Sequence, residues 1–588
     1  MKMSVGQAYL MALQSFQQND FHLAYRYLNP IVKQVPQHLD AHFLLGLCAR
    51  KLGDSDMAAR ILLDLLKKKR LPDYLIALGN LYVQQQLYTE AESLYKEVLA
   101  RQPHHDALVN LSRVYFVQAN WLAAKDALKG ALAIKPGDRP SRLSYIECLR
   151  QLGEEGVALK ELRVFIQQPD LSQQLIEKAA FLFFSLGSPV EATQVLVTRC
   201  QMDNISGATM DLMYKLIADR KTHCIVAAWL AKVPATHPCY RQSLDIRFRT
   251  LWGGERDQAF SVYEWSDLNV AGVFEDYVKK LMKCGLYEKA YRALHSGSST
   301  TFGVTFLKGV LALEMNAPEE AHSCFDALLE TNSEDGQLLE FKAKACLASE
   351  QISEARALMD TRLKQADLTQ GSYALYGTVL KKSGDFKAYR QLFDYDRLVQ
   401  FRSVDLKTDN LYEDLLGYLT DLHSLNYEPF EQSLRGGSQT VGQLFDSQVP
   451  VIVELKKRIL RQLTGLKRGD EIGSLSPLAN IASDDLIIKD SWSVLLHSGH
   501  FHANHFHNAG DYSACLYLDV SGVGQVAGEG WLKFGQAELG EWFKDHPDFI
   551  VQPKEGLLVV FPSYMWHGTE SFSANHQRMT VAFDIKFI

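Results

Sequence analysis

The feature that most constrains the fold of this chain is an alanine that recurs every 33 or 34 residues. It stands just after an acidic or polar turn segment, and the first intervals are 34, 33, 33, 34 and 34 residues. The first six copies are Ala24, Ala58, Ala91, Ala124, Ala158 and Ala192. Less regular copies follow at Ala227, Ala259, Ala290, Ala321, Ala355 and Ala388. This period indicates helical hairpins that stack as a solenoid, because each hairpin leaves an apolar face that only the next one covers.

The clearest single copy of the repeat runs from about Pro72 to Pro103. Gly79 and Ala91 are small in this copy, which predicts that its two helices cross closely at these positions. Tyr82 is predicted to fill the space between neighbouring hairpins.

In these features the chain resembles the tetratricopeptide repeat family over residues 1 to about 390. The match is strong as far as Ala192 and degenerate afterwards. Such solenoids usually present a concave surface to a partner, so the resemblance implies a protein or peptide partner. The alternative is that the array only spaces, dimerises or shields a catalytic domain.

After Ala388 the helical period ends and the pattern becomes that of a β domain. A connector at 393–408 and two helices, at 410–423 and 449–463, are predicted first. Strands are then predicted at 491–496, 513–520, 557–561 and 578–585. Short strands between Gly, Pro and Asn turns indicate an all-β sandwich or barrel, with the helices covering one face.

Histidines gather near the end of the chain. His505 and His507 are two positions apart and would point to one side of a strand, and His567 can return on a neighbouring strand to complete a metal-binding face. His500 and His502 form a rival pair with the same spacing and the opposite parity. Both pairs cannot lie on one face of a regular strand.

Arg578 follows His567 by eleven residues, and Thr580 lies two positions further on the same strand face. An arginine there can hold an anionic co-substrate beside the metal, through two parallel hydrogen bonds to a carboxylate. Tyr517 and Trp492 are candidates for the pocket wall and equally for the barrel core. The turn at 435–440 either reaches the mouth of the site or simply connects two helices.

An ordered set of five blocks closely resembles a bacterial iron- and 2-oxoglutarate-dependent oxygenase family, which often follows tetratricopeptide repeats. That family belongs to the double-stranded β-helix, or jelly-roll, superfamily. The blocks are Trp492-Ser493-Val494, His502-Ala503-Asn504-His505-Phe506-His507, Gly530-Trp531-Leu532-Lys533-Phe534-Gly535, Phe561-Pro562-Ser563-Tyr564-Met565-Trp566-His567-Gly568-Thr569 and Arg578-Met579-Thr580-Val581-Ala582-Phe583-Asp584. The resemblance covers about 393–588.

This resemblance implies a site that binds Fe(II), 2-oxoglutarate and O₂. It implies three metal ligands, His505, His507 and His567, and it favours this pair over the rival because His507 stands six residues before the next strand. Arg578 would pair with the distal carboxylate of 2-oxoglutarate, with Thr580 and Tyr517 beside it.

The ligand pattern departs from the commonest one in that family, which is two histidines and a carboxylate. His507 stands where the acid is expected, so the ligand set is either three histidines or includes a carboxylate from elsewhere. Asp511 is the nearest acid in sequence. A set of three histidines also suits zinc or copper.

The resemblance therefore implies an Fe(II)- and 2-oxoglutarate-dependent dioxygenase, in its simplest form a hydroxylase, whose repeats recruit a protein, peptide or carrier-bound substrate. Three alternatives stay open: an oxygenase of a small metabolite with repeats used for assembly, a non-enzymatic repeat scaffold with a degenerate metal-binding jelly roll, and a cupin-like metalloenzyme. The predicted domains are well-matched repeats at 1–200, degenerate repeats at 201–392 and the jelly-roll domain at 393–588.

Composition limits which partners and which cellular compartment are expected. The net charge of −7 gives no electrostatic footprint for nucleic acid or an anionic membrane. The nine cysteines are scattered without a CxxC pair, which indicates neither a zinc ribbon nor a disulfide framework. No signal-peptide core and no run of about 18 apolar residues is found, so a cytoplasmic location is expected. Homo-oligomerisation stays open.

Overall fold

The computed structural model describes residues 3–217, 220–252, 256–296, 301–423, 430, 433–440, 443–447, 449–467, 473–520, 523, 526–573 and 577–588. The chain forms two compact units, Met1–Thr209 and Met210–Ile588. The second unit contains both helical repeats and strands, and the domain boundaries expected from the sequence stay predictions.

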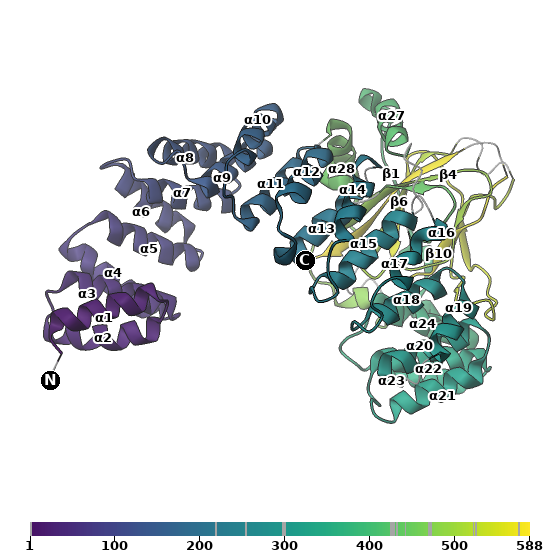
Figure 1. Cartoon of the computed structure of the whole chain (residues 1–588). Helices are drawn as coiled ribbons and strands as arrows, with labels where there is room; N and C mark the ends of the chain where they lie inside the picture. Colours follow the sequence, from purple (N-terminus) through teal and green to yellow (C-terminus); the bar gives the residue numbers. More distant parts are fainter. Residues whose placement is uncertain are drawn as a thin grey trace. The chain divides into compact units, whose positions relative to one another are not determined.

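The first unit is a row of antiparallel helix pairs, which follow one another along the chain (Figure 1). Its helices are α1 Val5–Gln17, α2 Phe21–Gln34, α3 Leu39–Lys51, α4 Ser55–Lys68, α5 Pro72–Gln84, α6 Tyr88–Leu99, α7 His105–Val117, α8 Trp121–Ile134, α9 Arg139–Gln151, α10 Glu155–Ile166, α11 Gln173–Ser185 and α12 Pro189–Arg199. A short 3₁₀ helix, η1 Met202–Asn204, follows them.

Small residues lie at the helix crossings of this unit, as the repeat pattern predicts. All of the first six periodic alanines have no exposed surface: Ala24, Ala58, Ala91, Ala124, Ala158 and Ala192. A Cβ atom on Gly79 would lie only 2.6 Å from the ring of Tyr95. Tyr95 is itself fully buried and donates a hydrogen bond from its hydroxyl to Asn80 Oδ1 at 2.7 Å. The close crossing expected at Gly79 is therefore present.

The second unit begins with further helical hairpins. Its helices are α13 Gly207–Leu216 (at the boundary), α14 Arg220–Leu230, α15 Tyr240–Trp252, α16 Arg256–Ala259, α17 Ser261–Glu264, α18 Val273–Lys283, α19 Tyr287–His295, α20 Phe302–Glu314, α21 Pro318–Leu329, α22 Gly336–Ala348, α23 Ile352–Arg362, α24 Gln370–Lys382, α25 Phe386–Leu392 and α26 Tyr395–Leu398. Ala259, Ala290, Ala321 and Ala355 are fully buried, whereas Ala227 and Ala388 are half-buried.

Strands dominate the rest of the unit. They are β1 Gln400–Ser403, β2 Leu434–Arg435, β3 Ser438–Gln439, β4 Leu486–Leu496, β5 Phe501–His502, β6 Tyr512–Asp519, β7 Leu532–Phe534, β8 Phe549–Val551, β9 Leu557–Pro562, β10 His567–Thr569 and β11 Arg578–Phe587. The helices among them are η2 Thr408–Asn410, α27 Leu411–His423, η3 Leu444–Asp446, α28 Pro450–Gln462 and η5 Pro477–Asn480.

Two antiparallel sheets form the core of this region. The larger has the strand order β1-β9-β6-β11-β4-β3 and the smaller the order β10-β7-β8. They pack on each other through Phe534 of β7 and Phe561 of β9, whose ring centroids lie 4.9 Å apart. A helical-repeat solenoid followed by a jelly-roll-like pair of sheets is the fold class that the sequence predicts.

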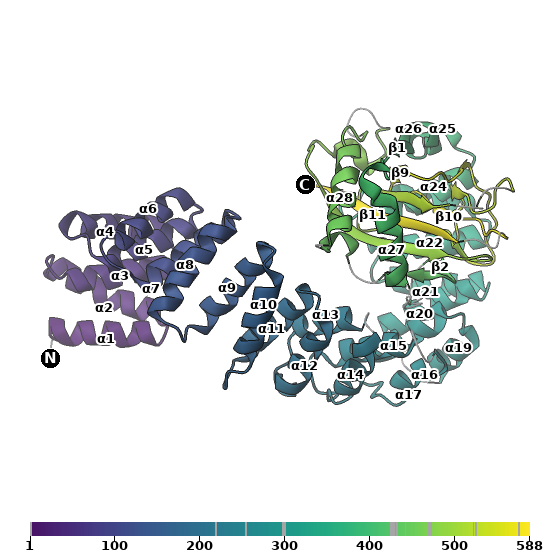
Figure 2. The ribbon, with the colours of Figure 1, turned by 90° about the horizontal axis from the view of Figure 1, so that it is seen from above.

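Strand β11 shows how the larger sheet divides its two faces. Met579, Val581 and Phe583 lie in the hydrophobic core that also contains residues of α27 and α28. Figure 2 shows these two helices over the sheet. The alternate residues Arg578 and Asp584 line a cavity on the other face. The helices therefore cover one face, as expected, and leave the other for a site.

Several short elements differ from the sequence prediction. The stretch 393–408, predicted as a connector, contains α26 and also β1, which pairs with β9 at the edge of the sheet. The strand predicted at 491–496 begins at Leu486. Strands of two to four residues give too little alternation to be recognised in a sequence. Within the described residues, no helix is both long enough and apolar enough to span a bilayer.

Candidate functional site

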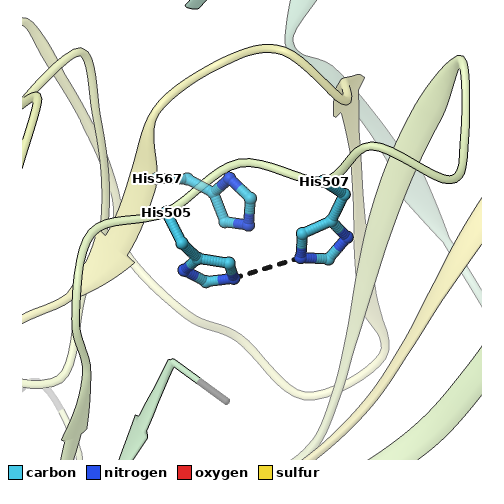
Figure 3. A group of neighbouring side chains, drawn as sticks. All are labelled: His505, His507 and His567. Atoms are coloured by element: carbon cyan, nitrogen blue, oxygen red, sulfur yellow. Dashed lines mark hydrogen bonds between the residues drawn. The ribbon is translucent and has the colours of Figure 1, made fainter. Parts of the chain in front are cut away.

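Three imidazole rings converge at the end of the cavity that β11 lines. His505 and His507 come from the loop between β5 and β6, and His567 begins β10 (Figure 3). One ring nitrogen of each lies within 4.8 Å of the corresponding atoms of the other two. The structure thus brings together the three histidines that the sequence analysis selected.

The backbone around the histidines is held by hydrogen bonds rather than by a regular strand. The amides of His505 and His567 each donate to the carbonyl of the other at 2.8 Å, in an isolated β-bridge. The amide of His507 donates to the carbonyl of Ser563 at 2.9 Å. The prediction that His505 and His507 share one face of a strand was therefore right about their convergence and wrong about the local structure.

The far side of each ring is already occupied by an acceptor. The Nδ1 atoms of His505 and His567 lie 2.9 Å from the carbonyls of Ala503 and Met565. The Nδ1 atom of His507 lies 2.6 Å from Oδ1 of Asp584. A carbonyl or carboxylate can only accept, so each Nδ1 carries the hydrogen, and each neutral ring presents the lone pair of its Nε2.

The Nε2 atoms on the inner sides of the rings therefore require a cation between them. The Nε2 atoms of His505 and His507 are 3.1 Å apart, as the dashed line in Figure 3 marks. Two lone pairs at this distance repel unless a proton or a metal ion lies between them. Two nitrogens bound at right angles to one metal, with bonds of about 2.1 Å, are about 3.0 Å apart. A shared proton would satisfy one pair of rings, whereas a metal ion satisfies all three.

Burial keeps the rings of His505 and His567 uncharged. Burial and the neighbouring His507 lower the pKa of His505 to about 3. Burial, His505 and His507 together lower the pKa of His567 well below its usual range. Neutral imidazoles are the form that binds metals, so the surroundings prepare these side chains as ligands.

The structure favours the ligand set of three histidines. Among the described residues, the group able to hold a metal here contains no carboxylate. Asp511, the nearest acid in sequence, instead accepts hydrogen bonds from Lys586 Nζ at 2.6 Å and from the amide of Phe587 at 3.0 Å. Asp584 approaches only the outer nitrogen of His507, where it orients the ring.

Asp584 is a site residue that the sequence analysis did not single out. It also accepts a hydrogen bond from the hydroxyl of Ser513 at 2.7 Å, and both residues line the cavity. Arg578, Thr580 and Asp584 are separated by even numbers of residues along β11, so the two-residue period of a strand places them on one face. This period was the sequence signal that could have identified Asp584.

Arg578 is buried in the cavity wall, and part of its hydrogen-bonding capacity is unused. It is 3% exposed, and its Nε and Nη1 atoms have no hydrogen-bond partner among the described residues. Its guanidinium lies 5.0 Å from the centre of the Tyr517 ring. A buried cation without a partner is costly, so this arrangement fits an anionic ligand, with Thr580 lining the same cavity.

The aromatic candidates divide between wall and core. Trp492 lines the cavity, and its ring centroid lies 5.6 Å from that of His507. Tyr517 is fully buried and does not belong to the lining, so it supports Arg578 from behind. Burial raises the pKa of Tyr517, which keeps its hydroxyl protonated.

The rival histidine pair does not converge as a ligand set. His500 lies beside His497, with ring centroids 5.9 Å apart. His502 lines the cavity next to His505, and its Nδ1 lies 3.0 Å from the hydroxyl of Ser433. The parity argument failed for His502 because β5 ends there and residues 503–507 form no regular strand.

The turn at 435–440 reaches the site, which resolves another open alternative. Arg435, Gln439 and Thr440 line the cavity, because β2 pairs with β5 and β3 pairs with β4. This turn is therefore part of the cavity wall rather than a simple connection between helices.

Helix α24 of the repeats holds the histidine loop from outside. Gln370 Nε2 donates to the carbonyl of Gly510 at 3.0 Å, and the amide of Gly371 donates to Asn508 Oδ1 at 3.2 Å. A Cβ atom on Gly371 would lie 3.0 Å from the ring of Phe506. These contacts join segments about 140 residues apart, and no local pattern in the sequence predicts them.

Sequence comparisons find the two families that the sequence resembles. Residues 490–584 match the family described as Putative 2OG-Fe(II) oxygenase. Residues 9–73, 76–139 and 306–367 match the tetratricopeptide repeat family, so one matched stretch lies in the region expected to be degenerate. The fusion of repeats to an oxygenase-family domain, suspected from the sequence, is confirmed. No curated protein has a sequence that matches the chain significantly.

Three solved structures are similar to parts of the chain. A tetratricopeptide repeat protein from Parabacteroides merdae is 16% identical, with a TM-score of 0.32, and covers 42% of this chain and 98% of its own. Pseudomonas aeruginosa pilF is 16% identical, with a TM-score of 0.31, and covers 35% and 95%. A thermophilic repeat protein from Thermus thermophilus is 18% identical, with a TM-score of 0.27, and covers 31% and 100%.

Proposed function

Because the chain joins tetratricopeptide repeats to a domain of the 2OG-Fe(II) oxygenase family, we propose that it is an Fe(II)- and 2-oxoglutarate-dependent dioxygenase that hydroxylates its substrate. The observation that carries the proposal is Arg578, a buried guanidinium whose Nε and Nη1 atoms have no partner among the described residues and which lies in the same cavity as the converged imidazoles. A metal face and an anion-binding group in one cavity are the two parts that a 2-oxoglutarate site requires.

Each residue has a distinct role in this proposal. His505, His507 and His567 would hold Fe(II) through Nε2, and Asp584 would fix the orientation of His507. Arg578 pairs with the distal carboxylate of 2-oxoglutarate. The hydroxyl of Thr580 is placed to add a hydrogen bond, and Tyr517 supports the guanidinium.

When bound, iron, 2-oxoglutarate and O₂ would supply the oxidation: 2-oxoglutarate loses CO₂ and takes up one atom of O₂ to become succinate, and the other atom enters a C–H bond of the substrate. The chain contributes position and the exclusion of water. Trp492 and Phe561 form apolar parts of the wall around the histidines, and the α24 contacts hold their loop in place.

The repeats are proposed to recruit a protein, peptide or carrier-bound substrate, because such arrays generally mediate protein–protein contacts. The proposed compartment is the reducing cytoplasm, which rests on the scattered cysteines of the sequence.

The experiment that tests the function is the formation of succinate from 2-oxoglutarate, followed with and without Fe(II) and O₂. We expect slow substrate-independent turnover in the parent protein. Arg578→Met should raise the concentration of 2-oxoglutarate required by about 100-fold, since it removes a paired charged contact worth about 3 kcal/mol. Arg461→Met, which changes an exposed arginine of α28, should leave the requirement unchanged. Succinate formation that is insensitive to iron, or to Arg578→Met, would contradict the proposal.

A further inference from the structure

The cavity that contains the histidine cluster extends well beyond the strands. It has a volume of about 1350 Å³, and part of its lining comes from the helical repeats of the same compact unit. Pockets for small ligands usually have about 300–1,000 Å³. The space beside the proposed metal site therefore suits a larger ligand that also contacts the repeats.

The repeats contribute one consistent face to this cavity. Between α18 and α23 the lining residues belong to the first helix of each hairpin, α18, α20 and α22, except for Tyr287 at the start of α19. Figures 1 and 2 place α20 and α22 beside the strands. We call this surface the inner repeat face and define it by Lys279 and Lys283 of α18, Phe306 of α20, and Phe341 and Lys344 of α22.

The lysines of the inner repeat face are not neutralised. Lys279 and Lys283 stand one turn apart on α18, are exposed, and have no hydrogen bond or ion pair among the described residues. Their neighbour Lys280 does not line the cavity and pairs with Asp245 Oδ1 at 2.6 Å. On the same helix, the lysine that does not face the cavity is thus paired, and those that face it are free to bind a ligand.

Lys344 adds a third positive charge deeper in the cavity. Its Nζ lies 4.3 Å from the centre of the Phe341 ring. Its pKa is lowered by two effects, burial first and repulsion by Lys283 second, and attraction to Glu340 and Glu314 offsets part of this lowering. A bound anion would relieve both effects, because it replaces the lost water and separates the two cations.

Two of the acidic residues of the same wall are already engaged. Glu340 Oε1 accepts hydrogen bonds from Arg362 Nε at 2.8 Å and Ser372 Oγ at 2.6 Å. Glu314 accepts from the hydroxyl of Tyr287 at 3.3 Å, and burial raises its pKa. Glu541 is exposed and also lines the cavity. The inner repeat face therefore has more available positive than negative charge.

Apolar rings lie between these lysines. Phe306 and Phe341 pack edge to face, with ring centroids 4.9 Å apart, and both remain partly exposed to the cavity. A ligand for this surface must combine negative charge with apolar groups and extend over several helices. A polypeptide segment with acidic side chains has all three properties, whereas a small dicarboxylate has only the first.

We propose that the inner repeat face binds an acidic polypeptide segment and presents it to the histidine cluster, an inference that rests on the proposed oxygenase function. Every described residue that lines this cavity belongs to the second unit. Substrate selection is thereby assigned to the repeats of the second unit.

The test is a binding titration read by fluorescence anisotropy, which does not depend on turnover. The probe is a labelled peptide of about twelve residues in which Asp and Glu alternate with Ala and Leu. Its control has Asn and Gln in place of the acids. The full-length protein is held without oxygen, with Fe(II) and saturating 2-oxoglutarate, so that Arg578 is occupied. We expect the acidic peptide to bind at least about tenfold more tightly than its amide control.

Matched variants locate the binding surface. Lys283→Gln and Lys344→Met should each weaken binding of the acidic peptide by about tenfold, since each removes one charged contact. Lys364→Gln, which removes an exposed lysine outside the cavity lining, should leave binding unchanged. Lys283 is exposed, so its replacement does not threaten the fold even if Lys344→Met does.

Three results would overturn this inference: equal binding of the two peptides, parent-like binding by both lysine variants, or complete displacement of the peptide by millimolar succinate. The last would identify a small anion as the natural occupant. The absorption of the iron–2-oxoglutarate complex, recorded on the same samples, separates these outcomes from a failure of the oxygenase proposal itself.

Discussion

The hairpins of both units have a glycine where two helices cross closely, and they differ in what else they contact. In the first unit, Gly79 of α5 leaves room for the ring of Tyr95 on α6. In the second, Gly377 of α24 leaves room for the ring of Phe393 just beyond α25. Hairpins of the second unit also contact loops between the strands of that unit, through Gln370, Gly371 and Lys381. A repeat pattern thus predicts how hairpins stack, and it does not predict which hairpins belong to an active site.

The largest expected effect comes from filling these two glycine positions. A Cβ atom on Gly377 would lie 2.0 Å from the ring of Phe393, and one on Gly79 would lie 2.6 Å from Tyr95. We expect Gly377→Ala and Gly79→Ala each to lower the free energy of unfolding by about 2–3 kcal/mol, by overpacking. Thermal unfolding measures this loss, and iron binding with 2-oxoglutarate should weaken only in Gly377→Ala.

A control for that pair exists in α27. Nothing lies within 4 Å of a Cβ atom on Gly417, so Gly417→Ala should be neutral or stabilising by up to about 1 kcal/mol through helix propensity. Equal loss of iron binding in Gly79→Ala and Gly377→Ala would contradict the claim that the two units differ in their effect on the site.

The next effect concerns the carboxylate that orients His507. Asp584→Ala should lower the affinity for Fe(II) by about 10–100-fold, because the ring loses the acceptor that fixes its Nδ1 hydrogen. Asp490→Ala removes another carboxylate of the cavity wall, one that Gln443 contacts, and should leave iron affinity unchanged. Equal effects of the two substitutions would show that total charge, rather than orientation, governs binding.

Ion pairs of the two units should differ in strength. Lys381 Nζ lies 2.9 Å from both Asp545 Oδ1 and Asp548 Oδ1, and its side chain is 17% exposed. Lys381→Met should destabilise the second unit by about 2 kcal/mol, because it leaves two carboxylates without their partner. Arg163→Met breaks a solvent-exposed pair in the first unit and should change the free energy of unfolding much less, because water and salt screen that pair. Urea denaturation of both variants makes the comparison, and a reversed order would refute it.

The smallest expected effect is at the contact between α24 and the histidine loop. Gln370→Ala removes a single hydrogen bond to the carbonyl of Gly510 and should cost about 1 kcal/mol. Iron affinity should fall by no more than about fivefold, since Gly371 still holds Asn508. A loss as large as that of Asp584→Ala would mean that α24, more than the strands, sets the geometry of the site.

Local patterns in the sequence predicted a large part of this molecule. The alanine period predicted the repeats, and the two-residue spacing of Arg578 and Thr580 predicted that they share one face of a strand. The choice of His505 and His507 over the rival pair rested on a family resemblance, and the structure brings those two together with His567. Their service as iron ligands stays a proposal.

Contacts between distant segments explain what the sequence did not predict. Helix α24 reaches the histidine loop across about 140 residues, and the inner repeat face joins the cavity in the same way. Neither follows from a pattern within one helix or strand. His505 and His507 were placed on a strand because alternation is the only rule available at short range, whereas hydrogen bonds to His567 and Ser563 shape their loop.

The most direct test of the central claim is an anaerobic titration of the metal-free protein with Fe(II) and then 2-oxoglutarate, followed by visible absorption. The account predicts one iron per chain and a weak charge-transfer band on addition of 2-oxoglutarate. The band should be absent in His567→Ala, strongly weakened in Arg578→Met and retained in His500→Ala. Iron bound without any band in the parent protein, or a band that survives in His567→Ala, would contradict the account.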